Sequence, residues 1–263
     1  MNDYHKSYNA QDKMSESPKK YQELLSWLIE YLPRTGKILD AGCGPGFYAE
    51  QLKKFNENII CLDFTNINEN NESGLLFCRG SISSLPIKSN SIDFIYCLTV
   101  LQYIEDDANA INEFYRILKP KGKLLITVPT RRSPFWLIRE MEIYFGVYLW
   151  QSSWNVRPYQ YYTRKMIGNL VENKFDIIEI RGYLYNFFPR LKMFFLNLAK
   201  KNRYFKDFFS KFILLIKRNL KTEKSQGKSD YIFSNNRNNN IRKRQISKIS
   251  DLSYHYLIVL EKC

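Results

Sequence analysis

The sequence predicts an α/β fold built on a seven-stranded, mostly parallel sheet with helices on both faces. Two observations lead to this prediction. From residue 37 to residue 129, short β-rich apolar runs alternate with helical patterns, which is the rhythm of consecutive βαβ units. The chain also has 263 residues, of which 44% are hydrophobic, and this is enough to close one sizeable core.

The expected strands are continuous apolar runs rich in Ile, Leu, Val and Phe. Such runs are typical of strands that are buried on both faces of a parallel sheet. In chain order they are 37–42, 58–64, 75–80, 93–98, 123–129, 176–183 and 254–261.

Helices are expected in the gaps, at 21–32, 46–55, 106–118, 135–150 and 161–172. The pattern at 106–118 is the clearest, because its apolar residues recur at helical spacing and KPKG follows it. Pro33 ends the first helix.

The formal net charge of +14 is concentrated in one late segment. Residues 190–248 carry 17 Lys/Arg and 3 Asp/Glu, and the rest of the chain is balanced. Within 190–220 the phenylalanines form one helical stripe with the lysines largely off it, as in a helix that lies in a membrane interface. Residues 221–250 are polar and nearly free of apolar periodicity. The sequence therefore predicts a helical basic insertion between the last two strands.

Three roles are open for this insertion. Peripheral contact with a lipid surface through 190–220 and a structural cap over the active site are equally favoured. Binding of nucleic acid is less favoured, because the phenylalanines follow helical periodicity and no RNA-binding module is recognised.

The cysteines and the N-terminus indicate a cytoplasmic protein. Five cysteines are scattered without a CxxC pair, so we expect reduced and mostly buried thiols. The first 20 residues are polar and lack the apolar core of a signal peptide. No His/Cys cluster has metal-ligand spacing, so no metal is expected.

A glycine-rich loop follows the first expected strand, in the run ILDAGCGPGFYA at 38–49. Gly42, Gly44 and Gly46 allow a tight turn and a close approach of a ligand to the backbone. Asp40 stands just before them, and Asp63 ends the next strand, where a carboxylate can accept both ribose hydroxyls. The pattern therefore predicts a nucleotide-type ligand at the carboxyl edge of the sheet.

These residues resemble the class I S-adenosylmethionine-dependent methyltransferases, in particular the small-molecule group with a DxGCGxG loop. The stretches SLPIKSNSIDFIYCLTVLQYIED (84–106) and FYRILKPKGKLLITVP (114–129) are similar to further segments of that family in the same order. The resemblance covers roughly 20–183 and the last strand. It implies a Rossmann-like core and S-adenosyl-L-methionine as cofactor. A nicotinamide enzyme is the nearest alternative, but its GxGxxG spacing is absent.

The resemblance also implies roles in cofactor binding. Asp40 and the loop Gly42–Gly46 are expected to hold the methionine part, Asp63 the ribose, and Phe64 one face of the adenine. Ser81 stands where the family commonly has an acidic residue that meets the adenine amino group, so it is expected to accept that hydrogen bond more weakly. Leu98 and Gln102 fall where the family lines the pocket beside the reacting methyl group.

The residues offer more than one candidate for a catalytic base. Many relatives carry histidines where this chain has Gln102 and Tyr103, so Tyr103 is one candidate. His5, in an N-terminal segment that folds over the cofactor in this family, is the other, ahead of His255 in the last expected strand. Because the sulfonium already activates the methyl group, proximity alone is a third explanation.

The resemblance suggests four segments. Residues 1–36 form an N-terminal helical cap, and 37–183 form the cofactor-binding core with an acceptor-side insertion at 130–162. The basic insertion occupies 184–250, and 251–263 is the final strand. Aromatic and basic residues gather in 131–162. They either bind a flat, hydrophobic or anionic acceptor or pack the helices onto the sheet, and the two interpretations are about equally favoured.

The expected function is therefore O-methylation of a small-molecule, glycan or lipid-linked acceptor by in-line methyl transfer. An RNA methyltransferase that docks through the basic insertion is an alternative. A protein that binds the cofactor without catalysis is another, suggested by Ser81 and by the missing family histidines.

Overall fold

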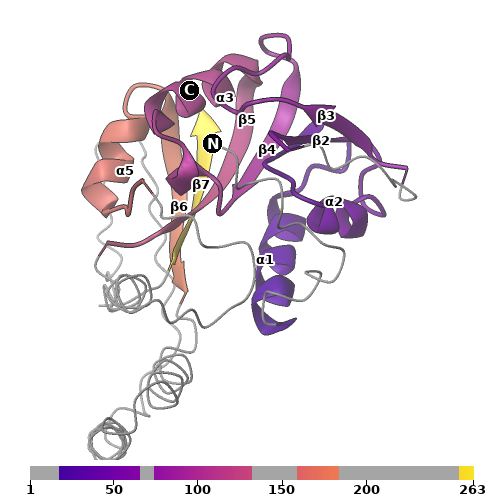
Figure 1. Ribbon diagram of the computed structural model, residues 1–263, viewed down its shortest axis with the longest axis horizontal. Helices are drawn as coiled ribbons and strands as arrows, with labels where there is room; N and C mark the ends of the chain where they lie inside the picture. Colours follow the sequence, from indigo (N-terminus) through magenta and orange to yellow (C-terminus); the bar gives the residue numbers. More distant parts are fainter. Residues whose placement is uncertain (1–17, 66–73, 132–158, 184–254) are drawn as a thin grey trace, which may run out of the picture.

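A computed structural model describes residues 18–65, 74–131, 159–183 and 255–263 (Figure 1). Its seven strands form one sheet in the order β3-β2-β1-β4-β5-β7-β6. All neighbouring pairs are parallel except those of β7, which runs antiparallel to both β5 and β6. The predicted sheet is confirmed. Its strands are β1 (Ile38–Ala41), β2 (Ile59–Asp63), β3 (Leu76–Arg79), β4 (Ile92–Leu98), β5 (Leu118–Pro129), β6 (Phe175–Tyr183) and β7 (His255–Lys262).

Helices cover both faces of the sheet, as Figure 1 shows. Residues of α1 and α2 join one buried apolar cluster, and residues of α3 and α5 join another on the opposite face. The fold is therefore a three-layer sandwich with a core on each side. The helical elements are α1 (Pro18–Tyr31), α2 (Phe47–Leu52), the short 3-10 helix η4 (Leu101–Tyr103), α3 (Asp107–Ile117) and α5 (Arg164–Val171).

The sequence of α3 explains its place. Asp106 caps its N-terminus by accepting a hydrogen bond from the Asn109 amide, which satisfies one of the free donors of the first turn. Its apolar residues then return on one face, and four of them are buried against the sheet. Burial of each of the three large side chains among them, Ile111, Phe114 and Ile117, stabilises the fold by about 1.5–3 kcal/mol.

Polar contacts hold α1 against the rest of the molecule. Arg181 on β6 forms a two-pronged ion pair with Glu30, both distances being 2.9 Å, and a further ion pair with the buried Glu179. At the other end of α1, the Tyr21 hydroxyl donates to the Phe47 carbonyl at the start of α2. The helix that follows the glycine loop is thus tied to α1.

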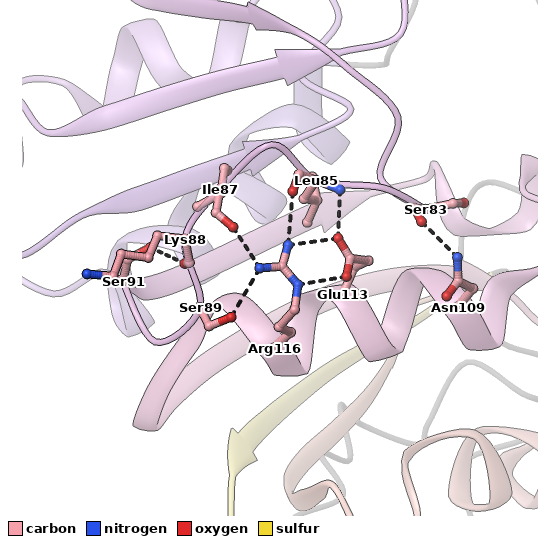
Figure 2. Close-up of polar contacts among 9 residues, drawn as sticks. All are labelled: Ser83, Leu85, Ile87, Lys88, Ser89, Ser91, Asn109, Glu113 and Arg116. Atoms are coloured by element: carbon pink, nitrogen blue, oxygen red, sulfur yellow. Dashed lines mark hydrogen bonds and ion pairs between the residues drawn. The ribbon is translucent and has the colours of Figure 1, made fainter.

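The loop between β3 and β4 is pinned to α3, as Figure 2 shows. The Arg116 guanidinium donates to the carbonyls of Leu85 and Ile87 at 2.9 and 2.7 Å, and Glu113 binds both Arg116 and the Leu85 amide. These bonds satisfy backbone groups that the loop cannot pair within itself. They therefore fix the segment that carries the chain from Ser81 into β4.

Four element boundaries differ from the sequence prediction by three residues or more, and the first is that α1 begins at Pro18 rather than at residue 21. β5 begins at Leu118, because Leu118 pairs with Ile92 before the strand bulges and resumes pairing at Lys123. α2 ends at Leu52, three residues earlier than expected, and the chain then turns. α5 begins at Arg164 rather than at residue 161, because Tyr162 bridges to Thr130 beyond the end of β5.

Several predictions lie outside the described residues. They are the helix at 135–150, the basic insertion at 184–250, and the first 17 residues, which include His5. In the part that is described, no helix is both long and apolar enough to cross a membrane.

Candidate functional site

The sheet reverses its strand order between β1 and β4. In open α/β sheets, ligands bind in the crevice outside the carboxyl ends of the strands at such a point. The glycine loop lies there, directly after β1. The Gly42 and Cys43 amides both donate to the Leu62 carbonyl, at 2.7 and 3.0 Å. The loop is therefore bonded to the end of the neighbouring strand β2.

Gly42 is required by both its conformation and its surroundings. Its φ is +79°, in the left-handed region that favours glycine. A Cβ atom at this position would lie only 2.4 Å from Cγ2 of Val100. The turn after β4 thus fills the space that the missing side chain leaves.

Asp63 links the loop to the end of β2. Its Oδ2 accepts a hydrogen bond of 2.9 Å from the Gly44 amide, and its Oδ1 accepts from the amide and hydroxyl of Thr65, at 2.9 and 2.7 Å. A carboxylate offers about four acceptor positions, so roughly one remains for a ligand. Asp63 can accept one hydroxyl as it stands, and a second one in exchange for a Thr65 contact.

Asp40 is a buried carboxyl group beneath the loop, with 4% of its surface exposed. Burial raises the pKa of Asp40 to about 8, the negative charge of Asp63 adds to this, and the nearby Tyr96 hydroxyl offsets it only in part. The hydroxyl makes no hydrogen bond of standard geometry with the described residues. An unpaired carboxylate would be costly here, so the Asp40 carboxyl is mostly protonated at neutral pH.

Cys43 is the one side chain of the loop with nucleophilic chemistry. A hydrogen bond with the Cys61 thiol and burial raise the pKa of Cys43 well above its ordinary range. The reactive form of cysteine is the thiolate. Cys43 is therefore a protonated, structural thiol.

The residues predicted to meet an adenine gather at the ends of β2 and β3. Phe64 follows Asp63 directly and is 52% exposed, which is unusual for a large aromatic side chain. The Gly80 amide donates to the Asp63 carbonyl, which holds the end of β3 beside β2. The Ser81 hydroxyl accepts from the Ser83 amide at 3.2 Å and keeps capacity for one further acceptor bond.

The turn after β4 contains a residue that the sequence prediction missed. Thr99 adopts a φ of +58°, which is a costly conformation for a β-branched residue. Its amide donates to the Thr127 hydroxyl on β5 at 2.8 Å, and its carbonyl accepts from Nε2 of Gln102 at 2.8 Å. No local sequence signal indicates this conformation, because its partners come from a distant strand.

Gln102 and Tyr103 lie on η4, and Leu98 is the last residue of β4. Gln102 is 2% exposed, whereas Leu98 and Tyr103 are half-buried. His255 is buried on β7, opposite Pro129 and Tyr183.

Tyr159, near the end of the expected acceptor-side segment, is hydrogen-bonded to η4. The Tyr159 amide donates to the Gln102 carbonyl at 2.9 Å, and the Tyr159 side chain is exposed. Tyr162 is instead buried in the core, with its hydroxyl donating to Asp107 at 2.8 Å. For Tyr162, packing is therefore the correct interpretation. The aromatic residues at 132–158 lie outside the described residues.

Within residues 18–65, 74–131, 159–183 and 255–263, no group of three or more His, Cys, Asp or Glu side chains is arranged to hold a metal ion.

The sheet order, the antiparallel last strand and the glycine loop at the reversal point define the Rossmann-like methyltransferase fold. Comparison with known proteins agrees, because residues 39–126 match the family model described as "Methyltransferase domain". A solved S-adenosylmethionine-dependent methyltransferase from Thermotoga maritima, titled a possible histamine N-methyltransferase, has a TM-score of 0.56. It is 16% identical, and the alignment covers 93% of this chain and 89% of that one.

Curated relatives agree as well. A protein from Mycolicibacterium smegmatis, named a probable S-adenosylmethionine-dependent methyltransferase, is 27% identical over 36% of this chain and 38% of its own length. A malonyl-[acyl-carrier protein] O-methyltransferase from Yersinia pestis is 27% identical over 34% of this chain. The chain spans only 38% and 35% of the length of these two relatives.

The chain therefore contains a methyltransferase domain match over residues 39–126 and has the fold of the class I S-adenosylmethionine-dependent methyltransferases. This class uses S-adenosyl-L-methionine as its cofactor. The residues present fit that group, since the glycine loop is bonded to the end of β2 at the reversal point and Asp63 keeps acceptor capacity beside the exposed Phe64.

Proposed function

We propose that the protein transfers a methyl group from S-adenosyl-L-methionine to a small-molecule, glycan or lipid-linked acceptor, on an oxygen atom. The contact between Asp63 and the Gly44 amide is the main support for this proposal. It joins the loop expected to hold the methionine part to the carboxylate expected to hold the ribose. One ligand that spans both groups would therefore bind to a site that is already assembled.

The cofactor supplies a sulfonium methyl group that is electrophilic when it binds. The chain then has to orient the two reactants and exclude water, because the displacement needs an in-line approach. Asp40 and Gly42–Gly46 are proposed to bind the methionine part. Phe64 and Ser81 are proposed to bind the adenine, and Leu98 and Gln102 to line the pocket near the methyl group.

A hydroxyl acceptor must also lose a proton. We propose Tyr103 or His5 for this step, with proximity alone as the alternative. Tyr103 lies on the turn that contacts the glycine loop through Val100, which supports its proposed role.

The proposed acceptor class rests on similarity and on sequence. One of the relatives is named an O-methyltransferase, which favours oxygen as the target. The amphipathic pattern of 190–220 favours a lipid-linked acceptor or peripheral contact with a membrane surface. We also propose a cytoplasmic location, which the scattered cysteines without a CxxC pair support.

The concentration of charge favours one other candidate, an RNA methyltransferase. Residues 190–248 hold the whole +14 excess, and a docking arm of this kind would make RNA affinity fall steeply with salt. RNA affinity that survives deletion of 190–250 would rule out this alternative.

The decisive experiment for the main proposal is a calorimetric titration of the protein with S-adenosyl-L-methionine. Asp63→Ala is expected to weaken binding by more than about tenfold, because it removes a charged hydrogen-bond acceptor. Glu172→Ala, an exposed carboxylate just after α5, is the matched control and should leave affinity unchanged. If the wild-type protein does not bind the cofactor, the proposal is wrong. Binding without methyl transfer to any fraction of a cell extract would favour a non-catalytic role.

A further inference from the structure

The side chain of Gln102 contains a buried polar atom that nothing in the described part of the chain satisfies. Its Oε1 has essentially no exposed surface and no hydrogen-bond partner there. A buried acceptor without a partner is unfavourable, and most such atoms in folded proteins are paired. This atom therefore needs an explanation.

The orientation of the Gln102 amide is determined by its neighbour. Nε2 donates to the Thr99 carbonyl at 2.8 Å. Because a carbonyl can only accept, the amide nitrogen must face Thr99, and the amide oxygen must face the other way. The side chain thus presents an acceptor, and it cannot rotate to present a donor without losing this bond.

Thr99 is itself held in place from β5. Its amide donates to the hydroxyl of the fully buried Thr127, and its own hydroxyl donates to the Leu98 carbonyl at 2.7 Å. These bonds stabilise the left-handed conformation that threonine otherwise avoids. Strained residues of this kind persist where surrounding structure holds them, and they cluster at ligand sites.

The turn that carries Thr99 and Gln102 lies next to the glycine loop of the candidate site. Val100, between Thr99 and η4, contacts Gly42 of the glycine loop so closely that a Cβ atom there would overlap it. The Gln102 backbone carbonyl also receives the Tyr159 amide at the end of the acceptor-side segment. Gln102 therefore stands between the cofactor loop and the acceptor-side segment.

We propose that Gln102 is a specificity-determining residue whose amide oxygen accepts a hydrogen bond from the methyl acceptor, with Thr99 and Thr127 as its positioning residues. This inference rests on the proposed function. It means that the acceptor carries a hydrogen-bond donor, such as a hydroxyl or an amine. A carboxylate has no hydrogen to donate, and its negative charge would face the negative end of the amide dipole.

The test uses the full chain saturated with S-adenosylhomocysteine and three probes on one ring, namely benzyl alcohol, benzylamine and benzoate. Dissociation constants are measured by ligand-observed NMR. Benzyl alcohol or benzylamine is expected to bind about tenfold more tightly than benzoate. Gln102→Met, of similar volume but without the acceptor, should abolish this preference.

Variants of the positioning residues add a second readout. Thr127→Val removes the hydroxyl that holds the Thr99 amide, and it should reduce the probe preference in the same way. Thr127→Ser keeps that hydroxyl and should restore the preference. Gln22→Met is the control. It makes the same substitution at an exposed position of α1 and should leave the probe preference unchanged.

The inference is overturned if the wild-type complex shows no preference among the probes, including the case in which none of them binds. It is also overturned if Gln102→Met keeps the preference, or if this variant weakens cofactor binding by about tenfold, since Gln102 would then serve the cofactor. Failure of the wild-type protein to bind S-adenosyl-L-methionine would instead refute the proposed function, so the two failures are distinguishable.

Discussion

The contact between Gly42 and Val100 predicts a large effect from the smallest possible substitution. Gly42→Ala adds one methyl group to a residue with a φ of +79°, and its Cβ would lie 2.4 and 2.9 Å from the two γ carbons of Val100. The left-handed conformation costs an alanine about 1–2 kcal/mol. Overpacking against a stiff β-branched side chain adds about 1–3 kcal/mol. The expected loss in the free energy of unfolding is therefore about 2–5 kcal/mol.

A double-mutant cycle separates these two contributions. Urea denaturation of the wild type, Gly42→Ala, Val100→Ala and the double variant should give a coupling energy of about 1–3 kcal/mol, because Val100→Ala removes the overlap but leaves the backbone cost. Gly168→Ala is the control. Gly168 lies within α5 with no atom within 4 Å of the added methyl group, so this change should stabilise the protein by about 0.5–1 kcal/mol. A coupling energy of zero would show that the turn after β4 does not pack on the loop.

Three further predictions address other parts of the molecule. Because the pKa of Asp40 is raised to about 8, the folded protein binds one proton more than the unfolded chain between about pH 4 and pH 8. Asp40 therefore lowers the free energy of unfolding by about 1.4 kcal/mol for each unit by which the pH rises in that range. Asp40→Asn should remove this slope in urea titrations at several pH values, and equal slopes would contradict it. Arg116→Met should destabilise the protein by about 1–3 kcal/mol, since the partly buried carbonyls of Leu85 and Ile87 lose their donor, and an unchanged denaturation midpoint would argue against that role. Finally, sedimentation with phosphatidylserine vesicles should show binding that Phe208→Asp weakens by about tenfold, whereas a cap over the active site predicts no binding in either protein.

The fold was predictable because its signals are local and repeated. Each strand is a continuous apolar run, and helices such as α3 carry their own spacing and cap. The predicted ends were less accurate, since they depend on partners. β5 extends back to Leu118 because Ile92 pairs with it, and α5 starts late because Thr130 bridges to Tyr162. Both partners are distant in the sequence.

Some features of the candidate site were predictable from the sequence, and others were not. The positions of Gly42, Gly44, Gly46, Asp40 and Asp63 at the ends of two strands were predictable, because their residue types and spacing restrict what the backbone can do there. The protonation of Asp40 was not predictable, since it depends on burial beneath the loop and on the charge of Asp63.

The sequence by itself determined the architecture and the loop at its carboxyl edge, because these follow from periodicity and from the conformational freedom of glycine, and its motifs showed the resemblance to the methyltransferases. Only the tertiary structure revealed the strained Thr99, its anchor Thr127 and the unpaired amide oxygen of Gln102. The physical reason is that strain and polar satisfaction depend on which groups meet in space, and β4 and β5 bring these three residues together from positions up to 28 residues apart.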